Sequence, residues 1–143
     1  MVSLAGREGL ISTDLLGSPI PIDARIALTV QHTAVATGDA THPIRTTRYE
    51  YQVLRSGKPL IEFHYHPGSK VKYCHVHVRP AGHEGQVLRK VHIPTGRVAL
   101  EDVLTMLIED FGVKAKGGAS AVLAANRAKF EDAQSWTGPG RRS

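Results

Sequence analysis

Histidines recur at every second position in two short stretches of this chain, His64-Tyr65-His66 and His75-Val76-His77. Residues two apart on a β-strand point to the same side of the sheet, so each pair would present two imidazoles together. Imidazole is a ligand for divalent transition metals, and near neutral pH it also donates and accepts protons. The two pairs therefore predict a site on a sheet face, for a metal ion or for acid–base chemistry.

The elements that must position these histidines are strands, because apolar and polar residues alternate around both pairs. Period-two alternation predicts strands over residues 25–31, 46–53, 60–66 and 73–78, with a looser one over 86–93. From Leu100 to Phe111 the apolar spacing changes to that of an amphipathic helix, which Gly112 should end. An alanine-rich run over 119–133 predicts a short C-terminal helix. We therefore expect an α+β fold, an antiparallel sheet of about five strands with the amphipathic helix on its apolar face.

Length and composition fit one domain. The chain has 143 residues, of which 41% are hydrophobic and 22% charged, and we expect a single α+β domain over residues 1–134. Gly and Pro break residues 1–23 into an irregular segment, and residues 135–143 should form a flexible tail. The lone Cys74 and the lack of a long apolar run favour a cytoplasmic protein that binds no membrane. The net charge of +5 favours an anionic partner.

Strand register follows from keeping the apolar side chains on one face. Pairing Phe63 with Val78 does this, and it sets His64 opposite His77 and His66 opposite His75. The connection over residues 55–58 must then be a three- or five-residue loop, because a regular two-residue turn would put Tyr49 and Tyr51 on the histidine side. Cys74 falls on the apolar face and should be a small core residue, and His32 should be an ordinary histidine near a strand end.

The opposite face then collects polar side chains from several strands. It should carry Arg48, Glu50, Gln52, Glu62, His64, His66, His75 and His77, with Lys90 and His92 from the fifth strand. The connection that follows the fifth strand would present Arg97 beside His92 at the sheet edge.

One chemistry that suits this face is metal-independent cleavage of RNA by its own 2′-hydroxyl, which needs a base, an acid and a cation for the phosphate. We predict Glu50 or Glu62 as base, His75 or His77 as acid and Arg48 as phosphate clamp, with His64 in the same catalytic set. Substrate contacts would come from His66, Lys90, His92 and Arg97. This hypothesis makes RNA the partner and needs no cofactor.

Three other interpretations stay open. His64, His66, His75 and His77 would equally hold a divalent transition metal as cofactor. A partial match to the cupin motifs exists, but the glycine and glutamate around the second histidine pair are misplaced. The face could also be an ordinary solvated surface, or part of a non-enzymatic interaction module.

Residues 48–113 resemble a group of small bacterial proteins. The resemblance rests on His64-Tyr65-His66-Pro67-Gly68, on His75-Val76-His77-Val78 and on the run from His92 to Val98, which reads HIPTGRV. More distantly, this order of strands and histidines ending in a helix is similar to the TumE type of toxin in bacterial toxin–antitoxin pairs. That resemblance implies a growth-inhibiting protein that acts on RNA and has an antitoxin partner.

Overall fold

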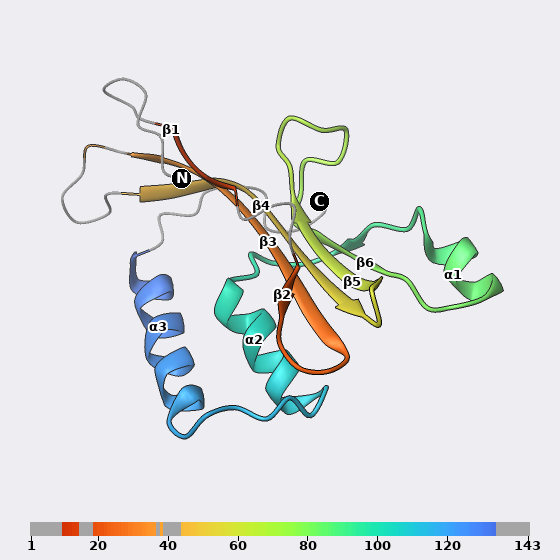
Figure 1. The fold of residues 1–143 in the computed structure, drawn as a ribbon. Coiled ribbons are helices and arrows are strands. Elements are labelled where there is room, and N and C mark those ends of the chain that lie inside the picture. The colour runs from red at the N-terminus through yellow and green to blue at the C-terminus, as the bar shows by residue number, and fades with distance from the viewer. Residues whose placement is uncertain (1–9, 15–18, 37, 39–43, 134–143) are drawn as a thin grey trace.

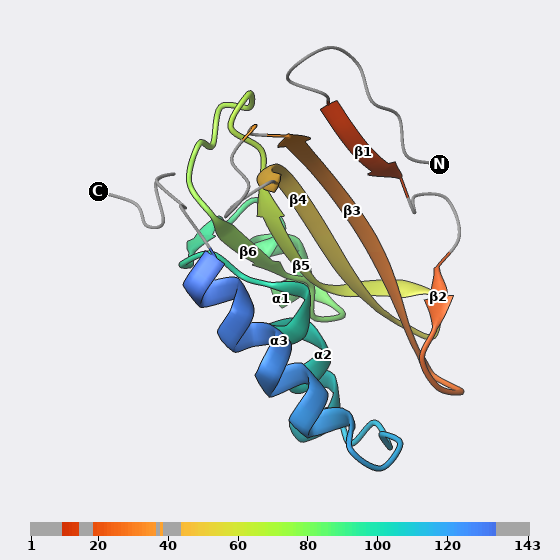
Figure 2. The ribbon, with the colours of Figure 1, turned by 90° about the vertical axis from the view of Figure 1, so that its left-hand side faces the viewer.

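The computed structural model describes residues 10–14, 19–36, 38 and 44–133, and it shows an open antiparallel sheet with helices beside it (Figures 1 and 2). The strands follow the spatial order β1-β3-β4-β5-β6-β7, and β2 also pairs with β3. Their bounds are β1 Leu10–Asp14, β2 Ile20–Pro21, β3 Ile26–Ala36, β4 Ile44–Arg55, β5 Lys58–Tyr65, β6 His75–Val78 and β7 Ile93–Pro94. The predicted α+β class is confirmed. The predicted tail, residues 135–143, lies outside the described residues.

Within the described ranges, three helices accompany the sheet: α1 His83–Leu88, α2 Leu100–Glu109 and α3 Ala119–Ala133. α2 lies against one face of the sheet and α3 lies alongside α2, whereas α1 lies at the other side of the molecule, near β6 (Figures 1 and 2). The predicted amphipathic and C-terminal helices are both present. None of the described helices is long and apolar enough to span a membrane.

The core forms between α2 and the apolar face of the central strands. Alternate residues of β3 and β4 are buried there together with Val103 and Leu107 of α2, as the period-two and helical patterns predicted. Tyr49, Tyr51 and Cys74 are fully buried in the same cluster, which confirms that Cys74 is a core residue.

Both ends of α2 are fixed by local bonds. At its N-terminus the Asp102 carboxylate accepts the Ala99 backbone N–H at 2.8 Å, although Ala99 itself has no capping side chain. At its C-terminus Gly112 takes a φ of +69°, and the next residue, Val113, donates its N–H to the Leu107 carbonyl and packs in the core. These bonds hold the apolar stripe of α2 in register with the sheet.

The turn between β4 and β5 is shorter than expected. Ser56 and Gly57 form a two-residue turn in which both have positive φ, so the predicted three- or five-residue loop is wrong. The ladder is irregular next to this turn, because Leu60 has no partner on β4. This one extra residue shifts the pairing so that Tyr51 faces Phe63 after all. The apolar side is preserved by a bulge in β5 instead of a longer loop.

The register between β5 and β6 also differs from the prediction. Phe63 pairs with Val76, which sets His64 opposite His75 and Glu62 opposite His77. The strands are therefore offset by two residues from the predicted alignment, and His66 lies beyond the paired region. An offset of two leaves every side chain on its face, so the apolar pattern that guided the prediction does not distinguish the two alignments.

Two other segments differ from their predictions. Residues 86–93 were expected to form a strand, but α1 and a turn occupy most of them and only Ile93 and Pro94 pair with β6. Residues 1–23 were expected to be irregular, yet β1 and β2 lie within them and both pair with β3. Both errors arise where apolar alternation is short or broken by Gly and Pro, so that distant pairing partners decide the conformation.

Candidate functional site

Three imidazoles meet on the sheet face that points away from α2. His64 comes from β5, and His75 and His77 come from β6; we call these three residues the histidine cluster. Each offers a ring nitrogen, and these atoms all lie within 4.8 Å of one another. The ring centroids of His64 are 5.4 Å from His75 and 5.0 Å from His77. The structure thus brings together the central residues that the sequence predicted.

Two further histidines flank the cluster. His92, which precedes β7, has its ring centroid 4.9 Å from His75 and 4.7 Å from His77. His66 follows β5 and stacks on His64, with ring centroids 5.2 Å apart. Five imidazoles therefore form one continuous patch, as the sequence predicted, although the partners differ from those of the predicted register.

This patch is not an ordinary solvated face. His75 and His77 keep only 3% and 6% of their surface exposed, whereas the valines on the other side of β6 are partly exposed. Glu62 of β5 is also buried, at 5%. Polar groups are buried in this way only when other interactions offset the loss of hydration. The burial of these three residues argues against the interpretation of this part of the sheet as a merely solvated surface.

Two carboxylates lie beside the cluster. Glu50 of β4 lies with one oxygen 3.8 Å from His64 Nε2 and the other 3.4 Å from His66 Nε2. Glu62 Oε2 is 4.0 Å from His64 Nε2, and the same carboxylate accepts hydrogen bonds from Arg79 Nε at 2.8 Å and from Gln52 Nε2 at 2.5 Å. Arg79 and Gln52 fix the orientation of Glu62, while Glu50 faces only imidazoles among these contacts.

The hydrogen-bonding groups of the cluster are only partly satisfied. The His75 Nδ1 lies 2.9 Å from the Tyr73 carbonyl oxygen, which can only accept, so Nδ1 carries the proton and Nε2 keeps its lone pair. His64 Nε2 and His77 Nδ1 are buried and have no hydrogen-bond partner among the described residues. Buried nitrogens without partners are uncommon and call for an explanation such as an ion or water.

Burial sets the protonation states of the site. It lowers the pKa of His64 to about 4, an effect that exceeds the opposing attraction of Glu50 and Glu62. Burial also lowers the pKa values of His75 and His77. For Glu62, burial raises the pKa but the bonds from Arg79 and Gln52 outweigh it, and the net pKa is lowered. At neutral pH the three histidines of the cluster are therefore uncharged and lie beside ionised carboxylates.

The pKa of the Glu50 carboxyl is also lowered. The His66 imidazole, 3.4 Å from a Glu50 oxygen, has the largest influence: it lowers the pKa of the Glu50 carboxyl and outweighs the effect of burial. Nearby charge on Arg48 contributes in the same sense.

The remaining predicted residues lie at different distances from the cluster. Arg48 is on the same side of β4 as Glu50, where its Nη2 donates to Gln31 at 3.4 Å. Lys90 lines a cavity beside the cluster instead of extending a fifth strand. Arg97 is on the opposite side of the sheet, with its guanidinium 4.1 Å from the centre of the Tyr49 ring. The structure therefore does not bring Arg97 into the predicted substrate-binding group.

Sequence reasoning overlooked two residues that contact this site. Tyr73 supplies the carbonyl that orients His75, and Arg79 holds Glu62. Both continue the alternation of His75 and His77, because residues 73, 75, 77 and 79 are spaced two apart. That spacing could have placed them on the polar side.

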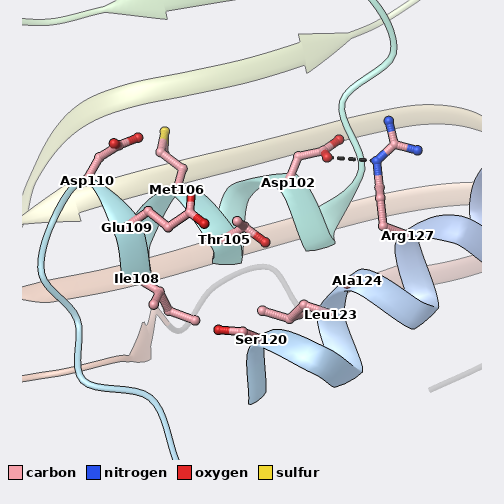
Figure 3. A pocket seen from close by; sticks show the side chains of 10 residues that line it. All are labelled: Asp102, Thr105, Met106, Ile108, Glu109, Asp110, Ser120, Leu123, Ala124 and Arg127. Atoms are coloured by element: carbon pink, nitrogen blue, oxygen red, sulfur yellow. Dashed lines mark hydrogen bonds and ion pairs between the residues drawn. The ribbon is translucent and has the colours of Figure 1, made fainter. Parts of the chain in front are cut away.

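A separate cavity of about 440 Å³ lies between α2 and α3 (Figure 3). Asp102 and Arg127 form an ion pair at 2.7 Å on one side of it, and Leu123 of α3 faces Ile108 of α2. None of the histidines that the structure describes lines this cavity.

Comparisons with protein-family models, with curated proteins and with solved structures found no match for this chain. The resemblance to the small bacterial proteins and to TumE-type toxins therefore stays a prediction.

Proposed function

We propose that this protein binds a divalent transition-metal ion, Zn²⁺ in the first instance, through His64, His75 and His77. The observation that carries the proposal is the convergence of three ring nitrogens within 4.8 Å. Nitrogens around a tetrahedral zinc ion lie about 3.3 Å apart, since Zn–N bonds are about 2.0–2.1 Å long. Small rotations of the side chains would close the remaining difference.

The hydrogen bonds around the cluster support this role. A histidine that binds a metal commonly donates its second ring N–H to a backbone carbonyl, which fixes the tautomer. His75 does so with Tyr73, and this leaves its Nε2 for the ion. A bound metal would also interact with His64 Nε2 and His77 Nδ1, the buried nitrogens that have no hydrogen-bond partner among the described residues.

The charges around the cluster support it as well. Metal ligands must be deprotonated, and the lowered pKa values of these imidazoles agree with that need. Glu50 and Glu62 supply negative charge within 4.0 Å of His64 Nε2 to balance a bound cation. Three protein ligands leave a fourth position for water, Glu50 or substrate, the arrangement that catalytic zinc sites share.

The ribonuclease hypothesis, with its antitoxin partner, stays a prediction. Its acid must carry a proton near neutral pH, whereas burial lowers the pKa values of both candidate acids, His75 and His77. The lowered pKa values of His75 and His77 therefore favour metal binding over acid catalysis of RNA cleavage. The two functions separate in EDTA, because a metal-independent ribonuclease would still cleave RNA.

The test is a zinc titration of metal-free protein prepared without a histidine tag, in competition with a chromophoric chelator. We expect one Zn²⁺ per chain. His75→Ala and His77→Ala should each lower the affinity by at least about 100-fold, because loss of a residue that only orients a metal ligand already costs about 10–100-fold. Co²⁺ substitution should give the visible spectrum of a nitrogen-rich tetrahedral site.

The matched control is His83→Ala on α1, because His83 is exposed and is not part of the cluster. Its zinc affinity should equal that of the wild type, and thermal melts should show that all variants fold. A stoichiometry near zero would refute the proposal, and so would an equal loss of affinity in His83→Ala and His75→Ala.

A further inference from the structure

A cavity of about 690 Å³ lies beside the histidine cluster, where the end of β6 leads into α1. Its charged lining residues are Arg79, Arg89, Lys90 and Glu62, so cations outnumber carboxylates by three to one. A concave surface lined by one sign of charge concentrates its potential and attracts ions of the opposite sign. The volume is in the range of small-molecule binding sites, about 300–1,000 Å³.

Arg79 is held in place at one side of this cavity. Its Nε and one Nη contact Glu62 Oε2 at 2.8 and 2.6 Å. Glu62 is itself buried, so this pair is protected from the screening that weakens exposed ion pairs. A guanidinium has five N–H donors, and these contacts occupy only part of them. Arg79 is therefore a preoriented donor at the cavity wall.

Arg89 and Lys90 supply positive charge to the cavity. Both follow α1 directly and are exposed, and neither forms an ion pair or side-chain hydrogen bond within the part of the chain that the structure describes. Glu62 is the one carboxylate in the lining, and Arg79 already pairs with it. The positive charge of Arg89 and Lys90 is thus available to a ligand.

The shape of the cavity depends on Gly85 of α1. A Cβ atom at this position would lie 1.7 Å from the Pro80 carbonyl oxygen, so only glycine allows α1 to approach this closely. Gly85 and Pro80 both line the cavity. This close approach fixes the part of the cavity wall that α1 forms, and Arg89 and Lys90 follow α1 directly in the chain.

We propose that this cavity binds a phosphate group through Arg79, Arg89 and Lys90. Arginine matches the geometry of phosphate oxygens with paired N–H donors, and lysine adds a point charge. Two uncompensated cations match the charge of a phosphate monoester dianion. The inference goes beyond the proposed metal site and does not depend on it, because none of the three cluster histidines lines the cavity. Glu62 borders both, so a bound phosphate would lie next to the metal.

The test measures binding of phenyl phosphate by calorimetry to metal-free and Zn²⁺-loaded protein at low salt. The double variant Arg89→Gln/Lys90→Gln should bind about tenfold more weakly or worse, because it loses two charge-assisted contacts. The control Arg45→Gln/Lys114→Gln removes the same charge at exposed positions outside the cavity and should bind like the wild type. A six-nucleotide RNA without terminal phosphates tests whether the phosphate belongs to a nucleic-acid backbone.

Each outcome has a definite meaning. If Arg89→Gln/Lys90→Gln loses binding of phenyl phosphate but not of RNA, the result supports a phosphate monoester as ligand. If it loses binding of RNA but not of phenyl phosphate, the result supports a backbone phosphate in the same cavity. Absence of binding to both probes overturns the proposal, as does an equal loss in the control variant. Zinc affinity should be unchanged in Arg89→Gln/Lys90→Gln, so failure of phosphate binding and failure of metal binding are recorded separately.

Discussion

Each face of the sheet holds a half-buried histidine whose pKa is lowered to a similar value, but the two histidines differ in their hydrogen bonds. Burial lowers the pKa of His32 on the core face to about 4, as it does for His64 on the other face. A ring nitrogen of His32 is hydrogen-bonded to the Tyr51 hydroxyl, whereas His64 Nε2 has no hydrogen-bond partner among the described residues. A lowered pKa alone therefore does not identify a binding site, whereas a buried ring nitrogen without a hydrogen-bond partner among the described residues does.

The side chains around His32 and His64 also differ between the two faces. On the core face Tyr49 and Tyr51 stack with ring centroids 5.1 Å apart, and Arg97 covers the Tyr49 ring. Aromatic stacking and a cation over a ring stabilise a fold without leaving ligand positions. On the other face imidazoles and carboxylates surround His64, and these groups serve binding better than packing. The core face thus stabilises the fold, and the other face carries the residues of the proposed metal site.

The largest expected effect comes from exchanging the two faces. Inserting one alanine between Glu62 and Phe63 would turn Phe63 and Tyr65 toward the histidine side and His64 toward the core. The cost should exceed about 5 kcal/mol, the lower end of the stability of natural domains, so the variant should not fold. Circular dichroism and thermal melts measure this.

The control for that insertion adds one glycine next to Gly57 in the turn. Turns tolerate extra length at small entropic cost, so this variant should keep a cooperative melt. If both insertions fold equally well, the pattern of faces does not determine the strand register.

A smaller effect distinguishes the faces by packing. Leu107 is 1% exposed in the core, so Leu107→Ala should lower the free energy of unfolding by about 2–5 kcal/mol. His64→Ala should change it by less than about 1 kcal/mol in metal-free protein, because His64 makes no hydrogen bond through its buried nitrogen. Urea titrations of both variants give the two values. A larger cost for His64→Ala would mean that the histidine face also carries the fold.

A third variant tests the satisfied histidine. His32→Ala leaves the Tyr51 hydroxyl buried without this bond, and we expect a loss of about 1–3 kcal/mol. Adding Tyr51→Phe removes the hydroxyl that has lost this partner, and the double change should cost less than the sum of the two single changes. Strict additivity in this double-mutant cycle would show that the two side chains are not coupled.

The two faces also share a pH dependence of stability. His32 and His64 have pKa values of about 4 when folded, below the value of 6.5 that applies when unfolded, so the unfolded chain binds more protons between these limits. Stability of the metal-free protein should therefore be full above about pH 6.5 and decrease as the pH falls toward 4. Melting temperatures recorded across this range should fall less steeply in His32→Phe and in His64→Ala. A flat profile in the wild type would contradict the assignment.

The sequence by itself determined which side chains share a face. Alternation in residues 46–53, 60–66 and 73–78 separated Tyr51 and Phe63 from His64 and His77, and the helical spacing from Leu100 identified the element that covers the apolar side. These patterns are local, because the side-chain period of a strand or helix is fixed by its backbone geometry. The candidate site was predictable as a set of residues on one face, except that Arg97 lies on the opposite face, over the Tyr49 ring.

Only the tertiary structure decided how those residues meet. The β5–β6 offset of two residues leaves the alternation unchanged, so sequence pattern could not choose His75 over His77 as the partner of His64. The bond between Arg79 and Glu62 and the burial of His75 depend on separate segments of the chain, and the bulge at Leu60 keeps the apolar residues of β5 on the face that α2 covers. Their energies come from long-range packing and desolvation, which a period of two or 3.6 residues does not encode.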